Sequence, residues 1–437
     1  MSNGERIGKY LVRDVLGEGA TSRVFLGYDP FAQREVAIKL IFPEVLKDRE
    51  RGRLYRHLLM NEASLAGKLV HPHIVQIYDA VVDDNISYVV MEYVPGGTLE
   101  QFCSPDRLLP VDRVVEIIFK CTRALDYAYR LGITHRDIKP ANILLASGDA
   151  SGGDAAGDIK ISDFGAAILN TGDQTQTQVS GVGSPAYMSP QQVREMPLTH
   201  QTDIYSLGVV MYQLLAGRLP FQASNNFSMV YQITNTDAAP PSAFRAGIPV
   251  SLDSVVARAM QKDLDARYAT WDAFAHDLAQ AFRNRQLSAR RNEFADSEKF
   301  ETLRGLPFFY YFSDVEIWEI VRFSDWDEVS PDTIIMKDGE SGDFFCFIVD
   351  GELRVMKRGR LLSVLTAGEC FGEMAVISRT HHTRGADVVA QTNARVVTIP
   401  GQALRNASEA CQMHFYQAFL EVLSARLAQA NSRLAST

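Results

Sequence analysis

Two short stretches of the sequence hold side chains suited to phosphate chemistry. HRDIKPAN contains Asp137, Lys139 and Asn142, and DFG contains Asp163. Carboxylate and amide oxygens bind Mg²⁺ across nucleotide phosphates, a carboxylate can orient an attacking hydroxyl, and a lysine can offset developing charge. Together these residue types predict the transfer of a phosphoryl group from a nucleotide.

A glycine-rich turn and a candidate ion pair precede these stretches. LGEGATSRV places Gly17 and Gly19 between two predicted strands, where bare backbone can approach phosphate oxygens closely. A glycine pair in a hairpin is by itself more often only a turn. VAIK then puts Lys39 on a strand, where a lone lysine is normally a solvated charge. Glu62 follows on or beside the apolar face of a predicted helix, and because an unpaired carboxylate there is costly, we expect it to pair with Lys39.

In this order, over residues 10–282, the motifs resemble a Hanks-type protein kinase domain of the Ser/Thr kind common in bacteria. The resemblance implies a bilobal α+β fold that binds ATP with Mg²⁺, or with Mn²⁺, and phosphorylates Ser and Thr hydroxyls of proteins. The implied catalytic residues are Asp137, which orients the hydroxyl, Lys139, which neutralises the phosphoryl group, and Lys39 with its partner Glu62. The implied metal ligands are Asn142 and Asp163. The implied ATP contacts are Gly17, Gly19, Val24, Ala37, Lys39, the gatekeeper Met91 and the hinge residues Glu92 and Val94.

Two positions depart from the family pattern. Ser22 stands where the third glycine of the phosphate loop usually lies, which leaves the backbone donors in place. Gln191 replaces a glutamate that pairs with an arginine in the family, and Arg267 is its implied partner here. Asp203 is implied to anchor the catalytic loop from a buried helix. No catalytic group is lost, so an active enzyme is favoured over the alternative, a pseudokinase.

The segment TGDQTQTQVSGVGS, which the resemblance makes an activation loop, contains candidate acceptor hydroxyls at Thr171, Thr175, Thr177 and Ser180. Arg136 is a cation that we expect to be buried without a partner when this loop is unmodified. We predict that the protein phosphorylates itself at Thr175 or Thr177, because the phosphate would supply the anion that Arg136 lacks and would order the loop.

A second set of phosphate-binding residue types lies much later in the chain. FGEMAV contains Gly372 and Glu373, and Arg384 follows one short loop later. An arginine fork and backbone N–H groups suit the phosphate of a cyclic nucleotide, and a carboxylate suits its 2′ hydroxyl. Residues 300–427 resemble a cyclic-nucleotide-binding domain, a β-roll with flanking helices, and the resemblance adds Ala386 to the ligand contacts.

Asp387 departs from that second pattern. It places a carboxylate near the expected phosphate or base, where it repels an anion unless Arg384, His381 or His382 offsets it. Two alternatives therefore stay open: a domain that binds a cyclic nucleotide or similar ligand and regulates the kinase, and a β-roll that binds no nucleotide and serves as a docking or dimerisation module in a scaffold. His381 and His382 are interpreted as solvated loop histidines rather than a metal site, since no third ligand has suitable spacing.

Periodicity predicts the elements that must position the first site. Five short apolar runs within residues 9–94 predict an antiparallel sheet. One helix interrupts the sheet, with Leu54, Leu58, Leu65 and Leu69 on a common face. Helical patterns dominate residues 111–282, and the polar, glycine-rich residues 147–158 are expected to form a loop tip.

A compact β domain is predicted to carry the second site. FFCFIV, ELRVMK and LLSVL are typical of strands separated by glycine turns. A closing amphipathic helix follows, with Phe415, Phe419, Val422, Leu423, Leu427 and Leu434 at helical spacing. We expect this helix to cover the ligand, and its pairing with a second subunit in a homodimer is left open.

Length and composition set the domain count and exclude several classes of protein. With 437 residues the chain needs two or three domains. We predict a kinase domain at 1–282 (N-lobe 10–94, C-lobe 95–282), a charged linker at 283–299 and a cyclic-nucleotide-binding-like domain at 300–437.

The net charge of −9 argues against nucleic acid or an anionic membrane as the main partner. Because the sequence shows neither a signal core nor an apolar run of about 18 residues, we expect no membrane span and a cytoplasmic protein. Five scattered cysteines predict reduced thiols rather than disulfides or a zinc site.

Overall fold

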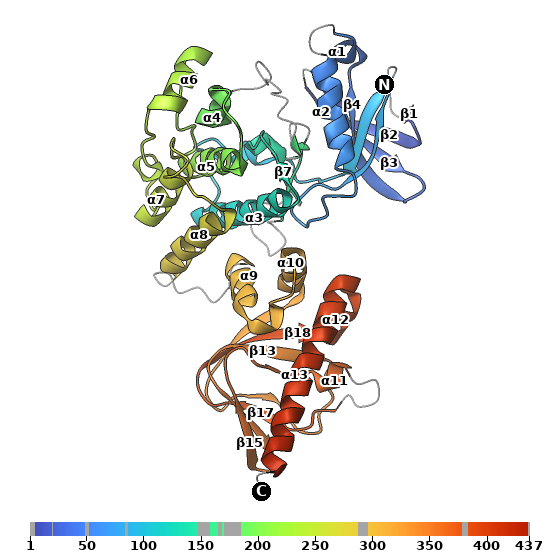
Figure 1. The fold of residues 1–437 in the computed structure, drawn as a ribbon, viewed down its shortest axis with the longest axis vertical. Coiled ribbons are helices and arrows are strands. Elements are labelled where there is room, and N and C mark those ends of the chain that lie inside the picture. Colours follow the sequence, from blue (N-terminus) through green and yellow to red (C-terminus); the bar gives the residue numbers. More distant parts are fainter. Residues whose placement is uncertain are drawn as a thin grey trace. The chain divides into compact units, whose positions relative to one another are not determined.

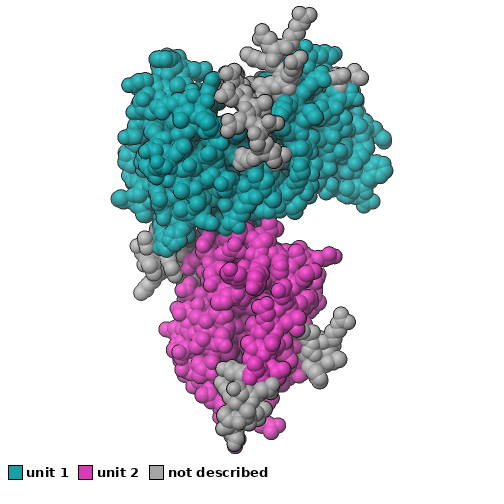
Figure 2. Space-filling view, viewed as in Figure 1, with its two compact units in different colours: residues 1–291 teal, residues 292–437 magenta. Residues whose placement is uncertain are grey.

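The computed structural model divides the chain into two compact units, residues 1–291 and 292–437 (Figures 1 and 2). The described residues are 5–19, 21–48, 52–83, 86–146, 158–164, 168–169, 185–286, 296–377 and 383–435. The division falls inside the predicted linker, yet both ends of that linker are helical: α8 (Trp271–Gln286) continues into it and α9 (Asp296–Gly305) begins before its end. Arginine and glutamine are good helix formers, so a loss of apolar periodicity does not by itself end a helix.

An antiparallel sheet forms the N-terminal lobe of unit 1 (Figure 1). Within the described residues its strand order is β1-β2-β3-β4-β6-β5. The strands are β1 (Arg6–Ile7), β2 (Tyr10–Glu18), β3 (Ser22–Asp29), β4 (Arg34–Ile41), β5 (Ile77–Val82) and β6 (Ser87–Glu92), which confirms the predicted apolar runs. Because side chains alternate between faces, Val36 and Ile38 pack in one core with Phe25, and Ala37 and Lys39 face the opposite side.

Helix α2 (Gly52–Ser64), with the short α1 (Pro43–Lys47), packs on the sheet face that carries Lys39. Leu59 of α2 belongs to a buried cluster with Val89, the residue paired with Lys39 across β4 and β6. The helix is shorter than predicted, because Leu65 and Leu69 are buried in the turns that follow it. Gly67 adopts a φ of 72° in these turns, a left-handed conformation that ends helices and that leucine spacing does not reveal.

Helices make up most of the C-terminal lobe of unit 1, as predicted. They are α3 (Val111–Arg130), α4 (Pro190–Val193), α5 (His200–Ala216), α6 (Asn226–Asn235), α7 (Val250–Ala259) and α8. Helix α5 is buried along nearly its whole length and packs against α3 and α7. Four short strands were not predicted, since two or three residues show no periodicity: β7 (Ile133–Thr134), β8 (Ile143–Leu145), β9 (Ile159–Ile161) and β10 (Ile168–Leu169). Residues 147–157, between β8 and β9, lie outside the described residues.

Unit 2 is a β-roll made of two antiparallel sheets, which in the described residues have the orders β11-β18-β13-β16 and β12-β17-β14-β15. The strands are β11 (Asp325–Val329), β12 (Ile334–Met336), β13 (Phe344–Asp350), β14 (Leu353–Lys357), β15 (Arg360–Leu365), β16 (Cys370–Phe371), β17 (Asp387–Ala390) and β18 (Ala394–Pro400). The flanking helices are α9, α10 (Asp314–Phe323), α11 (Met374–Ile377), α12 (Gly401–Asn406) and α13 (Glu409–Ala435). Cys346, Leu353 and Val396 contribute to the core between the sheets, and the three predicted strands are confirmed as β13, β14 and β15.

The closing helix α13 runs along the β-roll (Figure 1), and aromatic side chains anchor it there. The rings of Phe415 and Phe419 lie 5.7 and 5.0 Å from that of Phe345 on β13, in edge-to-face contacts that stabilise aromatic cores. The predicted stripe is nevertheless not one buried face, because Leu427 is exposed. Within the described ranges, no helix combines the length and the apolarity that a membrane crossing demands.

Gly208 of α5 permits the close approach of α7 and the residue that follows it. A Cβ atom at this position would lie 2.8 Å from the Cβ of Ala259 and 3.1 Å from the Cγ of Met260. Gly208→Val should therefore lower the unfolding free energy of unit 1 by about 1–3 kcal/mol, which thermal unfolding of the full chain would show as a drop of a few degrees. Ala257→Val, on the exposed side of α7, is the control and should stay within about 0.5 kcal/mol of wild type. An unchanged melting temperature for Gly208→Val would contradict the close packing.

Candidate active site

Lys39 of β4 lies between two carboxylates. Its Nζ is 3.4 Å from Oε2 of the buried Glu62 on α2, and it also pairs with Oδ1 of Asp163. Burial alone lowers the pKa of Lys39, but the charges of Asp163 and Glu62 outweigh it and raise that pKa. The charge of Lys39 in turn lowers the pKa of Asp163. The expected contact between Lys39 and Glu62 is present, and Lys39 is held as a cation.

Asp137, Lys139 and Asn142 converge just before β8. Nζ of Lys139 donates to Oδ2 of Asp137 at 2.7 Å. Nδ2 of Asn142 donates to the carbonyl oxygen of Asp137 at 2.8 Å and to Oδ2 at 3.1 Å. Asn142 ends a buried 3₁₀ turn, Pro140–Asn142. Because its amide nitrogen faces Asp137, its Oδ1 is turned away and can serve, with the carboxylate of Asp163, as a hard oxygen ligand for a divalent cation.

Asp203 of α5 holds the backbone of this catalytic segment. Its two carboxylate oxygens accept the N–H groups of His135 and Arg136, each at 2.7 Å. Arg136 has a φ of 68°, a strained value for a residue with a side chain, and the charge-assisted bonds to Asp203 stabilise that conformation. Burial raises the pKa of Asp203, opposed by the charge of His135 and by these two bonds. Asp203 therefore occupies the anchoring position that was expected of it.

His135 also positions Asp163, the first residue of DFG. Its Nε2 is 2.9 Å from the carbonyl oxygen of Ser162, and its ring packs on that of Phe164 with centroids 4.5 Å apart. Asp163 itself has a φ of 65°. These contacts on both sides of Asp163 direct its carboxylate towards Lys39.

The residues expected to contact adenine share one face of the N-terminal sheet. Val24 on β3 is the cross-strand partner of Lys39, and Ala37 on β4 is that of Met91 on β6. Directly paired residues lie on the same face, and so do residues two apart on one strand. Val24, Ala37 and Met91 thus form an apolar surface on the side of the sheet that carries Lys39.

Glu92 and Val94 lie where the chain leaves β6. The N–H of Glu92 donates to the carbonyl oxygen of Gln76 at 2.8 Å, and its carboxylate is 2.9 Å from Nζ of Lys160. The side chain of Glu92 is therefore occupied within the protein. The groups that this stretch can offer to a ligand are those of its backbone, as expected for a hinge.

The glycine-rich turn is the hairpin between β2 and β3. Gly17 pairs with Val24, and the N–H of Gly19 donates to the carbonyl oxygen of Ser22 at 2.8 Å. A Cβ atom added at Gly17 would meet nothing within 4 Å, so the backbone is open on that side. Ser22 begins β3 without interrupting the strand pairing, which agrees with the mild effect expected of a serine at this position.

Arg136 carries a buried Nε that has no hydrogen-bond partner among the described residues. Burial lowers the pKa of this guanidinium, and the charge of Asp203 opposes the effect. The phosphorylation sites predicted at Thr175 and Thr177 lie outside the described residues, as does Gly165 of DFG.

Gln191 and Arg267 form the neutral contact expected in place of an ion pair. Oε1 of Gln191 accepts from Nη2 of Arg267 at 3.0 Å, and its Nε2 donates to the carbonyl oxygen of Lys262 at 3.0 Å. Arg267 also donates to the carbonyl oxygens of Gln201 and Gln261, both at 2.8 Å. Burial lowers the pKa of Arg267 to about 10. The amide supplies both an acceptor and a donor at this buried point, whereas a glutamate would lack the donor.

In unit 2 the structure brings Arg384 to Gly372. Nη1 of Arg384 donates to the carbonyl oxygen of Gly372 at 2.9 Å, and Nη2 donates to that of Phe344 at 2.7 Å. A Cβ atom on Gly372, whose φ is 82°, would lie 2.7 Å from Nη1. Burial lowers the pKa of Arg384. The guanidinium that was expected to bind a phosphate is therefore held by backbone carbonyls.

Glu373 is bound by a residue that sequence reasoning missed. Its Oε1 lies 2.7 Å from Nη1 of Arg426 on α13, and Arg426 also donates to the carbonyl oxygen of Cys370. Glu373 is buried. A signal did exist in the sequence, because Arg426 falls on the same helical face as Phe415 and Phe419, and a cation on a buried face requires an acceptor.

Asp387 uses its carboxylate differently from what was expected. Its Oδ1 accepts the backbone N–H of Asp338 at 2.8 Å. Nζ of Lys357 lies 2.7 Å from Oδ1 of Asp338 and 2.6 Å from the carbonyl oxygen of Gly385. Oδ1 of Asp387 thus stabilises a turn, and the effect of this carboxylate on a bound anion stays a prediction. Ala386 is half-buried beside it, and residues 381 and 382 lie outside the described residues.

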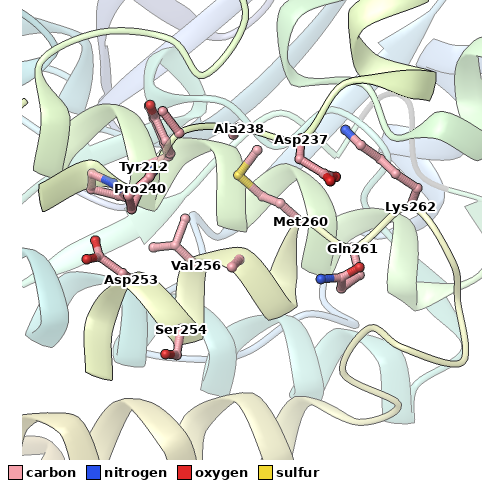
Figure 3. Close-up of a pocket in the computed structure, with 13 residues that line it drawn as sticks. Tyr212, Asp237, Ala238, Pro240, Asp253, Ser254, Val256, Met260, Gln261 and Lys262 are labelled. Atoms are coloured by element: carbon pink, nitrogen blue, oxygen red, sulfur yellow. The ribbon is translucent and has the colours of Figure 1, made fainter. Parts of the chain in front are cut away.

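A separate pocket of about 390 Å³ opens in the C-terminal lobe of unit 1, lined by α7 and the residues after it, by residues 237–241 and by Tyr212 of α5 (Figure 3). Lys262 and Asp237 lie at one end and Asp253 at the other, with Val256 and Met260 between them (Figure 3). Burial lowers the pKa of Lys262 to about 8, opposed by the charge of Asp237. The residues expected to bind ATP do not line this pocket.

Unit 1 has two lobes and brings Lys39, Asp137, Asn142 and Asp163 together, the side-chain types that phosphoryl transfer from a nucleotide requires. Residues 10–279 match the family model of the protein kinase domain, and residues 326–411 match that of the cyclic nucleotide-binding domain. The chain therefore belongs to the protein kinase domain family.

Individual relatives agree with this assignment. Serine/threonine-protein kinase PrkC of Bacillus subtilis is 35% identical over 306 residues, which cover 70% of this chain and 45% of that protein. Serine/threonine-protein kinase PknB of Mycobacterium leprae is 35% identical over 275 residues, 62% of this chain and 42% of that protein. A crystal structure of the PknI kinase domain of Mycobacterium tuberculosis is 26% identical, with a TM-score of 0.51 over 64% of this chain and 98% of that chain. The chain thus spans less than half the length of these two curated relatives.

The Gln191 amide is expected to stabilise the C-terminal lobe. Gln191→Ala removes the Oε1 acceptor of Arg267, whose Nη2 then keeps only the longer contact of 3.4 Å to the carbonyl oxygen of Lys262. The unfolding free energy of unit 1, measured by urea titration, should therefore fall by about 1–3 kcal/mol. Gln191→Glu should also destabilise, because the carboxylate cannot donate to that carbonyl. Gln222→Ala, at an exposed site, serves as the control. A Gln191→Glu variant more stable than wild type would show that the ion pair outweighs the lost donor.

Proposed function

We propose that this protein is an ATP-dependent protein kinase that phosphorylates Ser and Thr side chains of other proteins. The observation that carries the proposal is Lys39, which contacts Glu62 and Asp163 at once and so joins the N-terminal sheet, α2 and the DFG segment. Phosphoryl transfer depends on positioning and on charge stabilisation, and this arrangement provides both. The similarity to serine/threonine-protein kinases PrkC and PknB supports the same function.

Asp137 is the proposed catalytic carboxylate. It accepts the hydrogen bond of the attacking hydroxyl and receives its proton as the hydroxyl oxygen bonds to the γ phosphorus of ATP, while the bond from that phosphorus to the bridging oxygen breaks and ADP leaves. Lys139, 2.7 Å from Oδ2 of Asp137, places a cation beside the transferred phosphoryl group and offsets its charge. Asn142 orients the Asp137 carboxylate through its Nδ2.

The proposed metal ligands are Asn142, through its Oδ1, and the carboxylate of Asp163. Both are hard oxygen donors, and the hydrogen bonds of Asn142 to Asp137 turn its oxygen outward, so this pair fits a divalent cation. When bound, Mg²⁺ or Mn²⁺ neutralises the β and γ phosphates of ATP. Lys39 is proposed to contact the α and β phosphates.

The rest of ATP is proposed to lie along the sheet face described above. Its adenine contacts Val24, Ala37 and Met91, and the backbone of Glu92 and Val94 supplies hydrogen bonds at the hinge. The phosphates lie under the open backbone of Gly17 and Gly19. The strand pairing of these residues, which puts them on the face of Lys39, supports this arrangement.

Activation is proposed to depend on autophosphorylation at Thr175 or Thr177. The support is Arg136, whose buried Nε has no partner among the described residues. A phosphate would give this guanidinium a charge-assisted hydrogen bond, and Arg136 adjoins Asp137 in the chain. Fixing the position of Arg136 would then also fix that of its neighbour Asp137, the proposed catalytic carboxylate.

Replacing Asp137 tests the enzymatic role. Asp137→Asn keeps the size of the side chain but removes the proton acceptor, so transfer of labelled phosphate from ATP to casein should fall by about 10²–10⁴-fold. Glu44→Gln, on the exposed side of α1, is the control and should keep the wild-type rate. Undiminished transfer by Asp137→Asn would contradict the proposed role, and a wild-type chain that binds ATP without transferring phosphate would favour a pseudokinase.

We further propose that the β-roll binds a cyclic nucleotide or a similar ligand and that this binding regulates the kinase. The residues proposed for the ligand are Gly372, Glu373, Arg384 and Ala386. Arg384 is already placed against Gly372, and its N–H groups, now on two carbonyl oxygens, suit a phosphate. Regulation follows if the ligand favours one of two states of the chain, typically by about 1–3 kcal/mol.

Arg426 binds the same carboxylate, that of Glu373, that a ligand hydroxyl is proposed to bind. Nη1 of Arg426, which is carried by α13, lies 2.7 Å from Oε1 of Glu373 and so competes with a ligand hydroxyl for that oxygen. Ligand binding is therefore proposed to loosen α13 at this point. The same internal pairing also favours the second candidate function, in which the β-roll binds no nucleotide and acts as a docking or scaffold module.

Thermal unfolding of the full chain with cyclic AMP and cyclic GMP separates the two candidates. A ligand at about 100 times its dissociation constant should stabilise the chain by roughly 2.7 kcal/mol. Arg384→Gln should abolish the shift, and Arg426→Gln should tighten binding of the ribonucleotide more than of its 2′-deoxy analogue, because Glu373 is then free. Arg405→Gln, which breaks a surface pair with Asp343, is the control. No shift for a cooperatively melting wild type would favour the scaffold.

A further inference from the structure

We propose that the pocket in the C-terminal lobe of unit 1 binds a free basic α-amino acid, lysine or arginine. Its volume of about 390 Å³ falls in the size range of small-molecule sites, and the residues proposed to bind ATP do not line it. Among the described residues that line it, three carry a charge: Asp237, Asp253 and Lys262 (Figure 3). The lining therefore has two negative charges and one positive charge. A basic α-amino acid has the complementary set, two cationic groups and one carboxylate.

Lys262 and Asp237, at one end of the pocket, fit the head group of such a ligand. Nζ of Lys262 lies 4.4 Å from the ring centroid of Phe221 and 3.4 Å from the hydroxyl oxygen of Tyr205, so neutral groups hold the half-buried ammonium in place. Asp237 lies beside it, and the charge of this carboxylate acts to raise the pKa of Lys262. In the part of the chain that the structure describes, neither side chain forms an ion pair. The α-carboxylate of the ligand can therefore bind Lys262 while its α-ammonium binds Asp237.

Asp253, at the other end, fits the basic group of the ligand side chain. Its Oδ1 accepts the backbone N–H of Ser242 at 3.0 Å, which fixes the carboxylate, and no cation of the described ranges pairs with it. Asp253 and Met260 are seven positions apart, which is roughly 10 Å along α7 at 1.5 Å per residue. An extended lysine or arginine has a comparable length. The buried Val256 and Met260 lie between the two ends, where they can contact the methylene groups of the side chain.

Other occupants match the charges of the pocket less well. A lysine within a polypeptide has neutral amide groups where the free amino acid has its α-ammonium and α-carboxylate, so it would leave both Lys262 and Asp237 without a partner. A simple organic anion would bind Lys262 but would lie beside the carboxylate of Asp237, and a diamine would place a cation beside Lys262. Like charges at such short range lower affinity, so the arrangement of the three charged side chains selects the free basic amino acid.

Isothermal titration calorimetry of the full chain tests the class of ligand. L-lysine or L-arginine, titrated to about 10 mM so that a dissociation constant as weak as about 1 mM is measurable, should bind the wild-type chain. L-norleucine keeps the four side-chain carbons of lysine but lacks the ammonium, so it should bind about 10-fold more weakly than L-lysine or worse. Nα-acetyl-L-lysine amide, which lacks both head-group charges, should also bind more weakly. Absence of binding heat for both basic amino acids at two temperatures, or an acetylated amide that binds as tightly as L-lysine, would overturn the proposal.

Two amide variants, titrated in the same way, test the location of the site. In Asp253→Asn the amide oxygen can still accept the N–H of Ser242, so the fold should be kept while the affinity for L-lysine falls about 10-fold and that for L-norleucine stays unchanged. Asp237→Asn, at an exposed position, should weaken both ligands alike, because both carry the α-ammonium. Asp265→Asn changes an exposed carboxylate outside the pocket and should bind as wild type does. An Asp253→Asn variant with the circular dichroism of wild type and an unchanged affinity for L-lysine would contradict the proposed site.

Discussion

The contact of Lys39 with Glu62 and Asp163 is the interaction on which the proposed active site depends. Glu62 is buried on α2, where a carboxylate is tolerated only with a cation beside it, and Lys39 is the cation that the sheet supplies. Asp163 enters the same cluster from the C-terminal lobe. Removing Lys39 would leave two neighbouring carboxylates, one of them buried, without their cation. The pairing therefore holds α2 and the DFG segment in place relative to β4, and the apolar surface for adenine follows from the alternation of side chains along that strand.

Buried guanidinium groups in the two units are accommodated by the same means. Arg267 in unit 1 and Arg384 in unit 2 both donate to backbone carbonyl oxygens, and burial lowers the pKa of each. Carbonyl dipoles satisfy such a donor without introducing a second full charge, which limits the cost of burial. The consequences differ, because Arg267 is enclosed by the C-terminal lobe and is structural. Arg384 lies beside Gly372, where a phosphate offers a stronger acceptor than the carbonyls that hold it now.

Helix α13 joins the core of the β-roll to the ligand site proposed for unit 2. Phe415 and Phe419 attach it to the β-roll, and Arg426 brings it to Glu373 within the proposed ligand site. The exposed stripe that contains Leu420 and Leu427 runs along another side of the same helix. Arg426 therefore ties the position of α13 to the occupation of Glu373, while Phe415 and Phe419 keep the helix attached to the β-roll.

The sequence by itself determined the elements and the local constellations. Periodicity predicted the strands and most helices, and Lys139 and Asn142 contact Asp137 because they are only two and five positions away. Even the distant partner of Glu62 was predictable, since a buried carboxylate requires a cation. Only the tertiary structure decided that Arg426 pairs with Glu373, 53 positions away, that Asp387 stabilises a turn, and that α2 ends at Ser64. The physical reason is that spacing shows which face of an element is buried, whereas the packing of whole elements decides which distant group lies opposite that face.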